Sequence, residues 1–364
     1  MGKRVVPRRG RGAQSAQVPQ RFGLNAREAD GDWRDLQEVV DGAPPKLRTS
    51  VTEEHPKSVL TFNKSPDLVF DRSVNAYRGC EHGCIYCFAR PTHAFHDLSP
   101  GLDFETKLFA KPDAAALLRK ALARRGYEPR PIALGTNTDP YQPIERQYRI
   151  TRQVLETCLE TRHPVIITSK SDRVLDDLDL LADMAQLNLV AVAISVTSLD
   201  PQLSGSLEPR AASPAKRLAA LAALAERGIP AHCSIAPVIP AITDEYLESV
   251  VAQAASAGAR SASWILLRLP HEVAPLFREW LDVHFPDRAA KVMAIVREAR
   301  GGRDNDSQFF SRLRPQGTWA DLFRQRFRLA CRRAGLGPSQ LGLDSSRFRP
   351  PSPPPAIDAQ LSLL

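Results

Sequence analysis

The sequence predicts an α/β fold in which helices cover a parallel sheet, and we expect a partial (βα)6 TIM-type barrel with a basic helical C-terminal extension. Two observations favour this fold class. Strand-like and helical patterns alternate about six times along the chain, and polar residues follow the ends of most predicted strands. Parallel strands need long crossover connections, which the intervening helices supply. An open doubly wound sheet is the alternative that shares this pattern.

The predicted strands are short segments, most of them rich in apolar and β-branched residues. They comprise residues 73–77, 132–134, 165–168, 189–196, 231–237 and 264–267. The segments between them place apolar residues at helical spacing, and they comprise residues 114–124, 150–161, 174–185, 215–227 and 244–257. Capping residues flank the last two of these helices: Ser213-Pro214 and Gly228 the first, Thr243 and Gly258 the second.

The domain boundaries follow composition. Residues 1–50 are rich in Arg, Gly, Gln and Asp without sustained periodicity, which predicts a disordered basic segment. We expect a core domain over residues 60–300, a basic helical extension over 301–349 and a Pro-rich tail over 350–364.

Two further helices are expected at residues 288–300 and 319–334. The second carries Trp319, Leu322, Phe323 and Phe327, which we expect to face one side and pack on the domain, with its arginines in water. Phosphate binding by this basic helix is the alternative.

The charge is unevenly distributed over the 364 residues. Residues 1–50 carry 10 basic and 6 acidic side chains, residues 51–299 carry 28 and 30, and residues 300–364 carry 11 and 5. The basic ends suit a polyanionic partner such as a nucleic acid, or solvated tails that keep the protein soluble. No apolar run reaches the roughly 18 residues of a membrane span, and no secretory signal is present, so we expect a cytoplasmic protein without a membrane partner. The sequence indicates no oligomeric state.

Polar and charged residues gather after the predicted strands. The carboxyl ends of parallel strands meet at one edge of the sheet, where ligands bind. In chain order, the polar and charged residues after the strands are a cysteine cluster, Thr136 to Asp139, Lys170, Ser195 with Thr197, and Arg268. Loops are polar in any case, so this convergence supports a site without defining it.

The cysteine cluster is the informative motif. Cys80, Cys84 and Cys87 lie within eight residues, and in a reducing compartment such a group indicates a metal site rather than disulfides. Three thiolates in one loop suit an iron–sulfur cubane, with Gly79 and Gly83 letting the backbone turn closely around it. Three cysteine ligands on a four-iron cluster leave one iron with an open coordination position. Zinc is the alternative, with His82, His93 or His96 as the fourth ligand.

The spacing Cys-x3-Cys-x2-Cys, with Tyr86 before the last cysteine, resembles the signature of the radical S-adenosylmethionine (SAM) superfamily. The surrounding residues, Asn75 to Arg90, look like its spore photoproduct lyase-like branch. Other segments similar to this branch are Thr138-Asp139-Pro140-Tyr141-Gln142-Pro143-x-Glu145, Thr168-Ser169-Lys170-Ser171, Ser195-Val196-Thr197 and Glu208-Pro209-Arg210. The resemblance covers roughly residues 60–300 and agrees with the predicted barrel.

The resemblance implies a 4Fe–4S cluster on the three cysteines and SAM bound at the open iron. Reductive cleavage of SAM would release a 5′-deoxyadenosyl radical that removes a hydrogen atom from a substrate, with an external one-electron donor of the flavodoxin or ferredoxin type. By chemical type, the expected SAM contacts are Thr136, Thr138 and Asp139 for the ammonium, Lys170 and Arg210 for the carboxylate, Ser195 and Thr197 for the ribose, and Tyr86 beside the adenine. A purely structural role at a strand end is the alternative for each.

The sequence departs from the family at one place. Spore photoproduct lyases carry an additional hydrogen-donating cysteine near the end of the second strand, whereas residues 134–139 contain no thiol, so repair of a thymine lesion by that route is not expected. Cys233, on the fifth strand, is expected to be a small buried apolar residue rather than a replacement donor.

Two hypotheses follow. The first is a radical SAM enzyme that acts on a nucleic acid, a peptide or a small molecule. The second is a zinc-stabilised nucleic-acid-binding protein without catalysis. Phe309 and Phe310 stand among Arg303, Arg312 and Arg314, where they could stack on bases, although we expect them to anchor a helix.

Overall fold

The computed structural model describes residues 10–16, 47–337 and 342–352. Its main sheet has seven strands: β2 (Leu60–Phe62), β3 (Arg72–Val74), β6 (Ile132–Leu134), β7 (Val165–Ser169), β8 (Val190–Ser195), β9 (Ala231–Val238) and β10 (Ser261–Leu266). The order in the sheet is β10-β9-β8-β7-β6-β3-β2. All neighbours pair in parallel except β2, which runs antiparallel to β3 at the edge.

The order of the parallel strands in the sheet follows their order along the chain. A doubly wound sheet instead reverses its strand order at a switch point. The structure therefore confirms the α/β class with a parallel sheet and differs from the doubly wound alternative.

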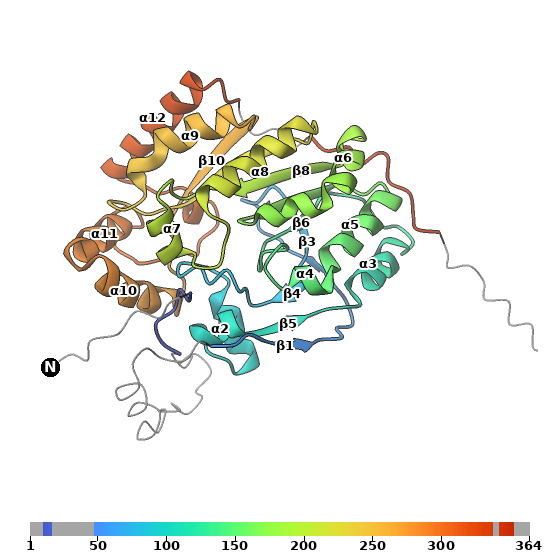
Figure 1. The fold of residues 1–364 in the computed structure, drawn as a ribbon, viewed down its shortest axis with the longest axis horizontal. Helices are drawn as coiled ribbons and strands as arrows, with labels where there is room; N and C mark the ends of the chain where they lie inside the picture. Colours follow the sequence, from blue (N-terminus) through green and yellow to red (C-terminus); the bar gives the residue numbers. More distant parts are fainter. Residues whose placement is uncertain (1–9, 17–46, 338–341, 353–364) are drawn as a thin grey trace, which may run out of the picture.

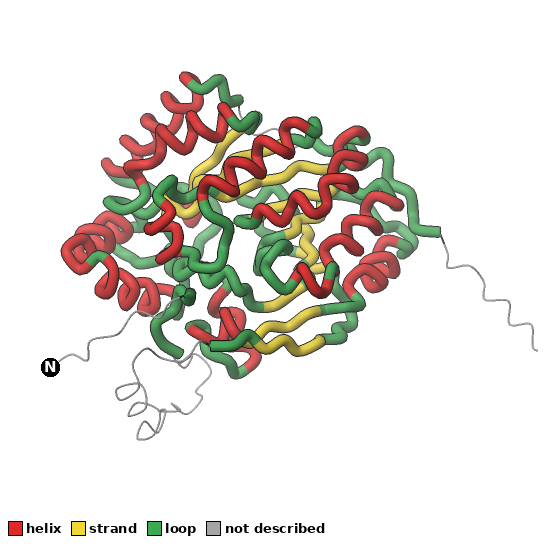
Figure 2. Tube along the Cα trace, in the orientation of Figure 1, coloured by secondary structure: helices red, strands yellow, loops and turns green. Residues whose placement is uncertain are grey.

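Helices fill the connections between these strands (Figures 1 and 2). They are α2 (Leu102–Thr106), α3 (Ala114–Leu122), α4 (Glu145–Tyr148), α5 (Ile150–Glu160), α6 (Leu178–Gln186), α7 (Pro201–Leu207), α8 (Pro214–Glu226) and α9 (Leu247–Ser256), together with the 3₁₀ helices η2 (Arg90–His96), η3 (Asp172–Asp177) and η4 (Asp244–Tyr246). After β10 follow α10 (Val273–His284), α11 (Pro286–Glu298), η5 (Ser311–Leu313) and α12 (Thr318–Arg333).

The two faces of the sheet differ in character. In β8, Val190, Val192 and Ile194 pack in one hydrophobic cluster with side chains of α5, α6 and α8. Because strand side chains alternate, Ala191 and Ser195 lie on the opposite face. That second face carries small and polar side chains and is the one available to a ligand.

The predicted helix ends are confirmed in part. Ser213 makes no side-chain cap hydrogen bond, and Thr243 precedes η4, where its hydroxyl accepts the Ile239 N–H instead of capping a helix. Ser213 precedes α8 in an extended conformation with Pro214 in its first turn. Gly228 follows with a φ of 71°, and the next residue, Ile229, donates its N–H to the Leu224 carbonyl. Gly258 ends α9 in the same way with a φ of 83°.

The first predicted strand, residues 73–77, is broken in the structure. Its start lies in β3, whereas β4 (Tyr77–Arg78) belongs to a second sheet with β1 (Ser50–Glu53) and β5 (Lys107–Ala110), in the order β1-β5-β4. At the break, the Asn75 carbonyl accepts from the Lys111 ammonium at 3.0 Å and the Ala76 carbonyl accepts from the Lys111 N–H at 3.0 Å, so the backbone pairs with the segment after β5 instead of continuing the first ladder.

Helix α12 packs on α9, as expected for an apolar stripe, but one predicted contact is wrong. Phe323 is buried, with its ring centroid 4.7 Å from that of Trp264 and 5.0 Å from that of Trp319. Leu322 instead is 56% exposed, because it lies one helical position away from the buried side. The predicted tail, residues 350–364, is described only up to residue 352.

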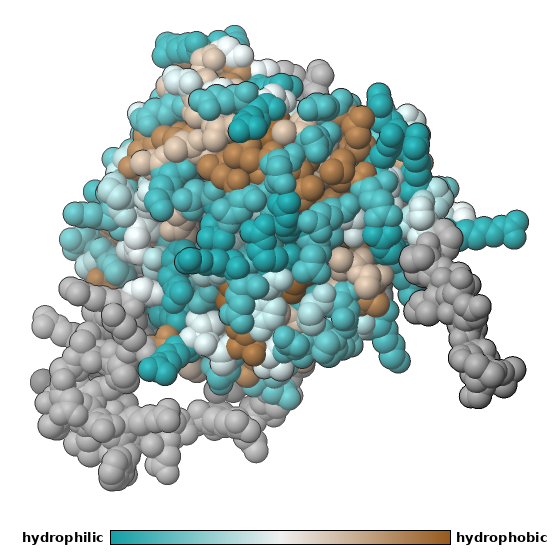
Figure 3. All heavy atoms as spheres, turned by 45° about the vertical axis from the view of Figure 1, so that its right-hand side comes forward, coloured by the Kyte–Doolittle hydropathy of each residue, from teal (hydrophilic) through white to brown (hydrophobic). Residues whose placement is uncertain are grey.

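The surface in Figure 3 is mainly hydrophilic, with a brown band of apolar residues across its upper part. Within the described ranges, none of the helices combines the length and the apolar character required to cross a bilayer.

Candidate cluster and cofactor site

The cysteines lie in a tightly turned loop after β4. Gly79 and Gly83 have φ values of 73° and 65°, a region that favours glycine. A Cβ atom on Gly79 would lie 2.8 Å from the Phe104 carbonyl oxygen, so the close approach also requires glycine. Successive turns follow, in which the Gly83 N–H donates to the Cys80 carbonyl and the Cys87 N–H to the Cys84 carbonyl. Both glycines therefore permit the tight turns of the loop, and their role beside a cluster stays a prediction.

The three thiols form one electrostatic group. Cys80 and Cys84 are buried and Cys87 is partly exposed. Burial raises the pKa of Cys80, and the charges of Asp139, Cys84 and Cys87 raise it further. Burial likewise raises the pKa of Cys84, with further contributions from Glu208 and Cys87 that Lys170 partly offsets. Buried thiolates that repel one another require a positive centre, which an iron–sulfur cluster supplies, so this donor set fits a cluster.

The zinc alternative needs a fourth ligand besides the three cysteines. Two of the three histidines considered for this place have other partners: His82 Nδ1 lies 3.3 Å from Asp139, and His93 Nε2 lies 2.9 Å from the Lys107 carbonyl. Zinc binding by either histidine at these nitrogens would require these contacts to break.

Arg90 supports the cysteine loop through hydrogen bonds to its backbone carbonyls. It is fully buried, and its five N–H groups donate to the carbonyls of Gly83, Cys84, Pro100 and Gly101 and to the Glu105 carboxylate. Glu105 is also fully buried and pairs with Arg90 at 2.5 Å. The planar guanidinium thus adds a donor to each of these carbonyls and places a cation against the buried Glu105 carboxylate.

Residues 10–16 pack against the same loop, although residues 1–50 are predicted to be disordered. The N–H groups of Gly12 and Ala13 donate to the Glu105 carboxylate at 3.1 and 2.8 Å, and Arg11 donates to the Glu105 carbonyl. A Cβ atom on Gly12 would lie 1.8 Å from the Gly83 carbonyl oxygen. The prediction of disorder is therefore wrong for this stretch, because a buried carboxylate far along the chain binds its backbone. Residues 1–9 and 17–46 lie outside the described residues.

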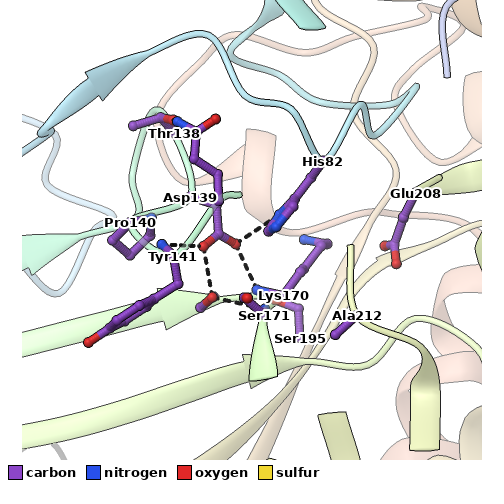
Figure 4. Close-up of polar contacts among 12 residues, drawn as sticks. His82, Thr138, Asp139, Pro140, Tyr141, Lys170, Ser171, Ser195, Glu208 and Ala212 are labelled. Atoms are coloured by element: carbon purple, nitrogen blue, oxygen red, sulfur yellow. Dashed lines mark hydrogen bonds and ion pairs between the residues drawn. The ribbon is translucent and has the colours of Figure 1, made fainter. Parts of the chain in front are cut away.

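Asp139 joins three segments of the site (Figure 4). Its Oδ1 accepts from the Tyr141 N–H at 2.9 Å and the Ser169 hydroxyl at 2.8 Å. Its Oδ2 accepts from the Lys170 N–H at 2.7 Å and lies 3.3 Å from His82 Nδ1. A carboxylate has about four acceptor positions, and all are used. Asp139 therefore ties the cysteine loop to the end of β7, and its predicted contact with the SAM ammonium stays a prediction.

The environment of Asp139 predicts that the free energy of unfolding depends on pH. Burial alone would raise its pKa, but His82 and the two backbone N–H groups lower it to about 2 from 3.8. The folded chain thus gains stability from the ionised form, fully above pH 4 and progressively less towards pH 2. We expect Asp139→Asn to lower the free energy of unfolding by about 2 kcal/mol at pH 7, and the difference from the parent to vanish near pH 2.

Urea unfolding of metal-free protein across this pH range checks the prediction. Asp179→Asn is the matched control, since its pKa is also lowered to about 2 but its side chain is 62% exposed, where solvent screens the interaction. A pH-independent effect of Asp139→Asn would contradict the role assigned to the carboxylate.

Thr138 and Gln142 hold the first cysteine in place. The Thr138 hydroxyl donates to the Gly79 carbonyl at 2.7 Å and accepts from Gln142 Nε2 at 3.0 Å. Gln142 also accepts the Glu81 N–H at 2.9 Å. Thr136 contacts the Asn75 amide instead. Both threonines thus have local partners of the kind expected for residues at strand ends.

Glu208 binds a second group of the predicted site residues, which includes Tyr86 and Thr197. It is fully buried and accepts hydrogen bonds from the Tyr86 hydroxyl, the Thr197 hydroxyl and Arg217. Burial raises the pKa of Glu208, although the Arg217 guanidinium opposes this shift. Arg217 also donates to the Ser195 carbonyl at 3.1 Å. Tyr86, Ser195 and Thr197 are thus brought together by a buried pair that sequence analysis did not identify as a site.

The two predicted carboxylate-binding cations differ. Arg210 pairs with Glu81 at 3.0 Å. The Lys170 ammonium lies 5.8 Å from the centre of the Tyr86 ring and close enough to Cys84 to lower its thiol pKa. Within the described part of the chain, this ammonium has no carboxylate partner. Lys170 is therefore the cation beside the cysteines that is available to an anionic group.

Cys233 lies on the helix-covered face of the sheet. It is fully buried in the main hydrophobic cluster, and burial raises the pKa of its thiol to about 12. Its expected role as a buried apolar residue is confirmed.

Comparisons with known proteins match this arrangement. A model of the radical SAM superfamily matches residues 74–254. An uncharacterised protein of Mycobacterium tuberculosis is 38% identical over 246 residues, which cover 66% of this chain and 72% of that protein. The chain belongs to the radical SAM superfamily. An uncharacterised protein of Methanocaldococcus jannaschii is 29% identical over 175 residues, 48% of this chain and 63% of that protein.

A solved structure of a spore photoproduct lyase variant has a TM-score of 0.55 to this radical SAM protein at 16% identity, covering 78% of this chain and 79% of that chain. The two proteins thus share a fold. Members of the superfamily are enzymes that use SAM and a 4Fe–4S cluster, and this chain is a radical SAM enzyme. The residues that would hold the cluster are Cys80, Cys84 and Cys87.

Proposed function

We propose that Cys80, Cys84 and Cys87 hold a 4Fe–4S cluster with one iron open to SAM, and that the enzyme removes a hydrogen atom from its substrate. The observation that carries this proposal is the three-cysteine loop, with two buried thiols, beside the Lys170 ammonium, which has no carboxylate partner in the described ranges. When bound, the cluster and SAM supply a 5′-deoxyadenosyl radical by one-electron cleavage of the sulfur–carbon bond. An external donor of the flavodoxin or ferredoxin type supplies the electron.

We further propose that residues 60–300 form a partial (βα)6 barrel, residues 301–349 a basic helical extension and residues 350–364 a Pro-rich tail. The consecutive order of the parallel strands and the helices packed on one face support the barrel. A parallel sheet has both faces covered in almost all proteins, and a barrel covers its second face by curving around its own interior.

In this arrangement the chain's own residues bind and orient SAM. Lys170 pairs with the methionyl carboxylate as a compact charge, while Asp139 fixes its backbone. Thr136 contacts the ammonium. Thr138 acts indirectly, by holding the Gly79 carbonyl beside Cys80. Ser195 and Thr197 line the ribose, and Tyr86 is held beside the adenine through Glu208. Arg210, which pairs with Glu81, is a secondary partner for the carboxylate.

We propose a nucleic acid as the substrate. The basic ends of the chain support this choice, with 10 basic against 6 acidic residues at 1–50 and 11 against 5 at 300–364. A spore photoproduct lyase structure with a TM-score of 0.55 to this chain holds a dinucleoside spore photoproduct. Residues 134–139 lack a thiol, so the product radical needs a hydrogen donor other than a cysteine of that loop.

The test is SAM cleavage by protein prepared without oxygen. We expect 5′-deoxyadenosine and methionine after addition of SAM and a reductant. In Lys170→Met we expect the KM for SAM to rise about 10- to 100-fold, because the carboxylate loses a charged hydrogen-bond partner. The control is Lys216→Met, whose ammonium pairs with Asp172 and is 67% exposed. An unchanged KM in Lys170→Met would contradict the assigned contact, and no cleavage by the parent would overturn the proposed function.

A further inference from the structure

Two exposed aromatic rings lie in the segment after α11. Phe309 is 51% exposed and Phe310 is 50% exposed. We expected this pair to anchor a helix, and the structure shows that this expectation is wrong, because neither ring belongs to a hydrophobic cluster of the described residues. We call Phe309, Phe310 and Arg312 the aromatic platform.

Hydrogen bonds to Asp67 fix the position of the aromatic platform. Arg312 makes two hydrogen bonds to Asp67, at 2.7 and 2.5 Å, and the Phe310 N–H donates to the same carboxylate at 3.0 Å. Asp67 and Arg312 are only 4% and 16% exposed. The Arg312 guanidinium carbon lies 5.0 Å from the centre of the Phe309 ring, as in cation–π pairs. Buried groups thus fix a ring that stays half exposed.

The platform is joined to the edge of the sheet where the cofactor residues lie. Arg300 donates to the Leu266 and Leu267 carbonyls at the carboxyl end of β10 and to the Arg312 carbonyl. The carboxyl ends of parallel strands share one edge, and that edge also carries Asp139 and Lys170. The platform is therefore joined through Arg300 to the carboxyl end of β10 and through Asp67 to the hairpin between β2 and β3.

Arg268 supplies a cation near the platform. It lies two residues after the end of β10, and its buried Nε atom has no hydrogen-bond partner among the described residues. Burial and the nearby Arg312 lower its pKa, while Asp67 and Asp306 oppose this more weakly. Asp67 is already bonded to Arg312, and within the described residues no carboxylate pairs with Arg268. The side chain is partly buried, and an anion would stabilise a cation held partly out of water beside another arginine.

We propose that the aromatic platform and Arg268 bind an unpaired strand of nucleic acid, with a base stacked on Phe309 and a phosphate on Arg268. This inference rests on the proposed function and narrows its substrate. A base presents a flat face to an exposed ring only when it is unpaired and unstacked, since a duplex hides these faces. An apolar peptide would use the rings but leave Arg268 without an anion.

The experiment measures fluorescence anisotropy of labelled oligonucleotides with the full-length, cluster-loaded protein. The probes are a DNA strand, an RNA strand of the same sequence and the DNA duplex. We expect the DNA strand or the RNA strand to bind more tightly than the duplex, and the comparison of the two strands identifies the natural one. We expect Phe309→Ala to raise the Kd for the preferred strand about tenfold, without changing the salt dependence. Arg268→Met should also raise the Kd and should reduce the slope of log K against log salt by about 0.7.

Two exposed side chains away from the platform are the matched controls. Leu322→Ala on α12 removes an apolar side chain that is 56% exposed, and Arg227→Met at the end of α8, outside the basic ends of the chain, removes an exposed charge; both should bind like the parent. The inference is overturned if Phe309→Ala and Arg268→Met bind like the parent, if Arg227→Met weakens binding as much as Arg268→Met, or if the duplex is preferred. SAM cleavage by the parent without any polymer tests the proposed function separately, so the two failures are distinguishable.

Discussion

In Cys84→Ala, we expect the brown colour and the release of 5′-deoxyadenosine to fall to background together. Cys84 is buried in the middle of the cysteine loop, and its carbonyl accepts a hydrogen bond from Arg90. Removal of its thiol leaves two cysteines for a cubane that needs three, and alanine offers no replacement ligand. The measurement is the iron content and visible spectrum of anaerobic protein, combined with a SAM-cleavage assay.

Cys331→Ala is the matched control for this variant. Cys331 is a partly buried cysteine on α12 that lies outside the site, and we expect both colour and cleavage to persist without its thiol. Retention of both properties in Cys84→Ala would eliminate the proposed cluster ligands.

The second large effect is expected in Arg90→Met. This substitution keeps an unbranched apolar stem but removes the guanidinium donors from the carbonyls of Gly83 and Cys84, and it leaves the buried Glu105 carboxylate without its cation. Loss of one partner of a buried ion pair costs about 3–5 kcal/mol. We expect a loss of this size in the free energy of unfolding, together with a reduced iron content.

The comparison for Arg90→Met is Arg119→Met. Arg119 pairs with Glu160, but both side chains are about 40% exposed, and exposed pairs contribute less than about 1 kcal/mol. Equal stability losses in the two variants, measured by urea unfolding, would show that the buried pair does not brace the loop.

The sequence predicted most of the main sheet correctly, because each strand from β6 to β9 is followed by an amphipathic helix of the predicted range. The second sheet was missed, since β4 has two residues and β1 and β5 four each, too few for a periodic pattern. Helix α10 was also missed, and its buried face pairs with the loop of Cys84 and Tyr86 in a separate hydrophobic cluster.

At the site, residue type and spacing were sufficient to single out the three cysteines, but not to identify the residues that hold the surrounding loops in place. Glu208 and Arg217 are nine residues apart in sequence, and nothing local indicates that they form a buried pair that holds Tyr86 and Thr197. Asp139 was predicted to contact a ligand because it follows a strand, whereas its partners come from residues 82, 141, 169 and 170. Arg90 stands in the cysteine motif, and this position was the one available signal for the brace it forms with Glu105.

The most direct test of the three-cysteine cluster is the metal and sulfide content of the full-length protein prepared without oxygen. We predict about four irons and four acid-labile sulfides per chain, held by three cysteines. One zinc ion per chain with no labile sulfide would contradict this account and favour a zinc site instead.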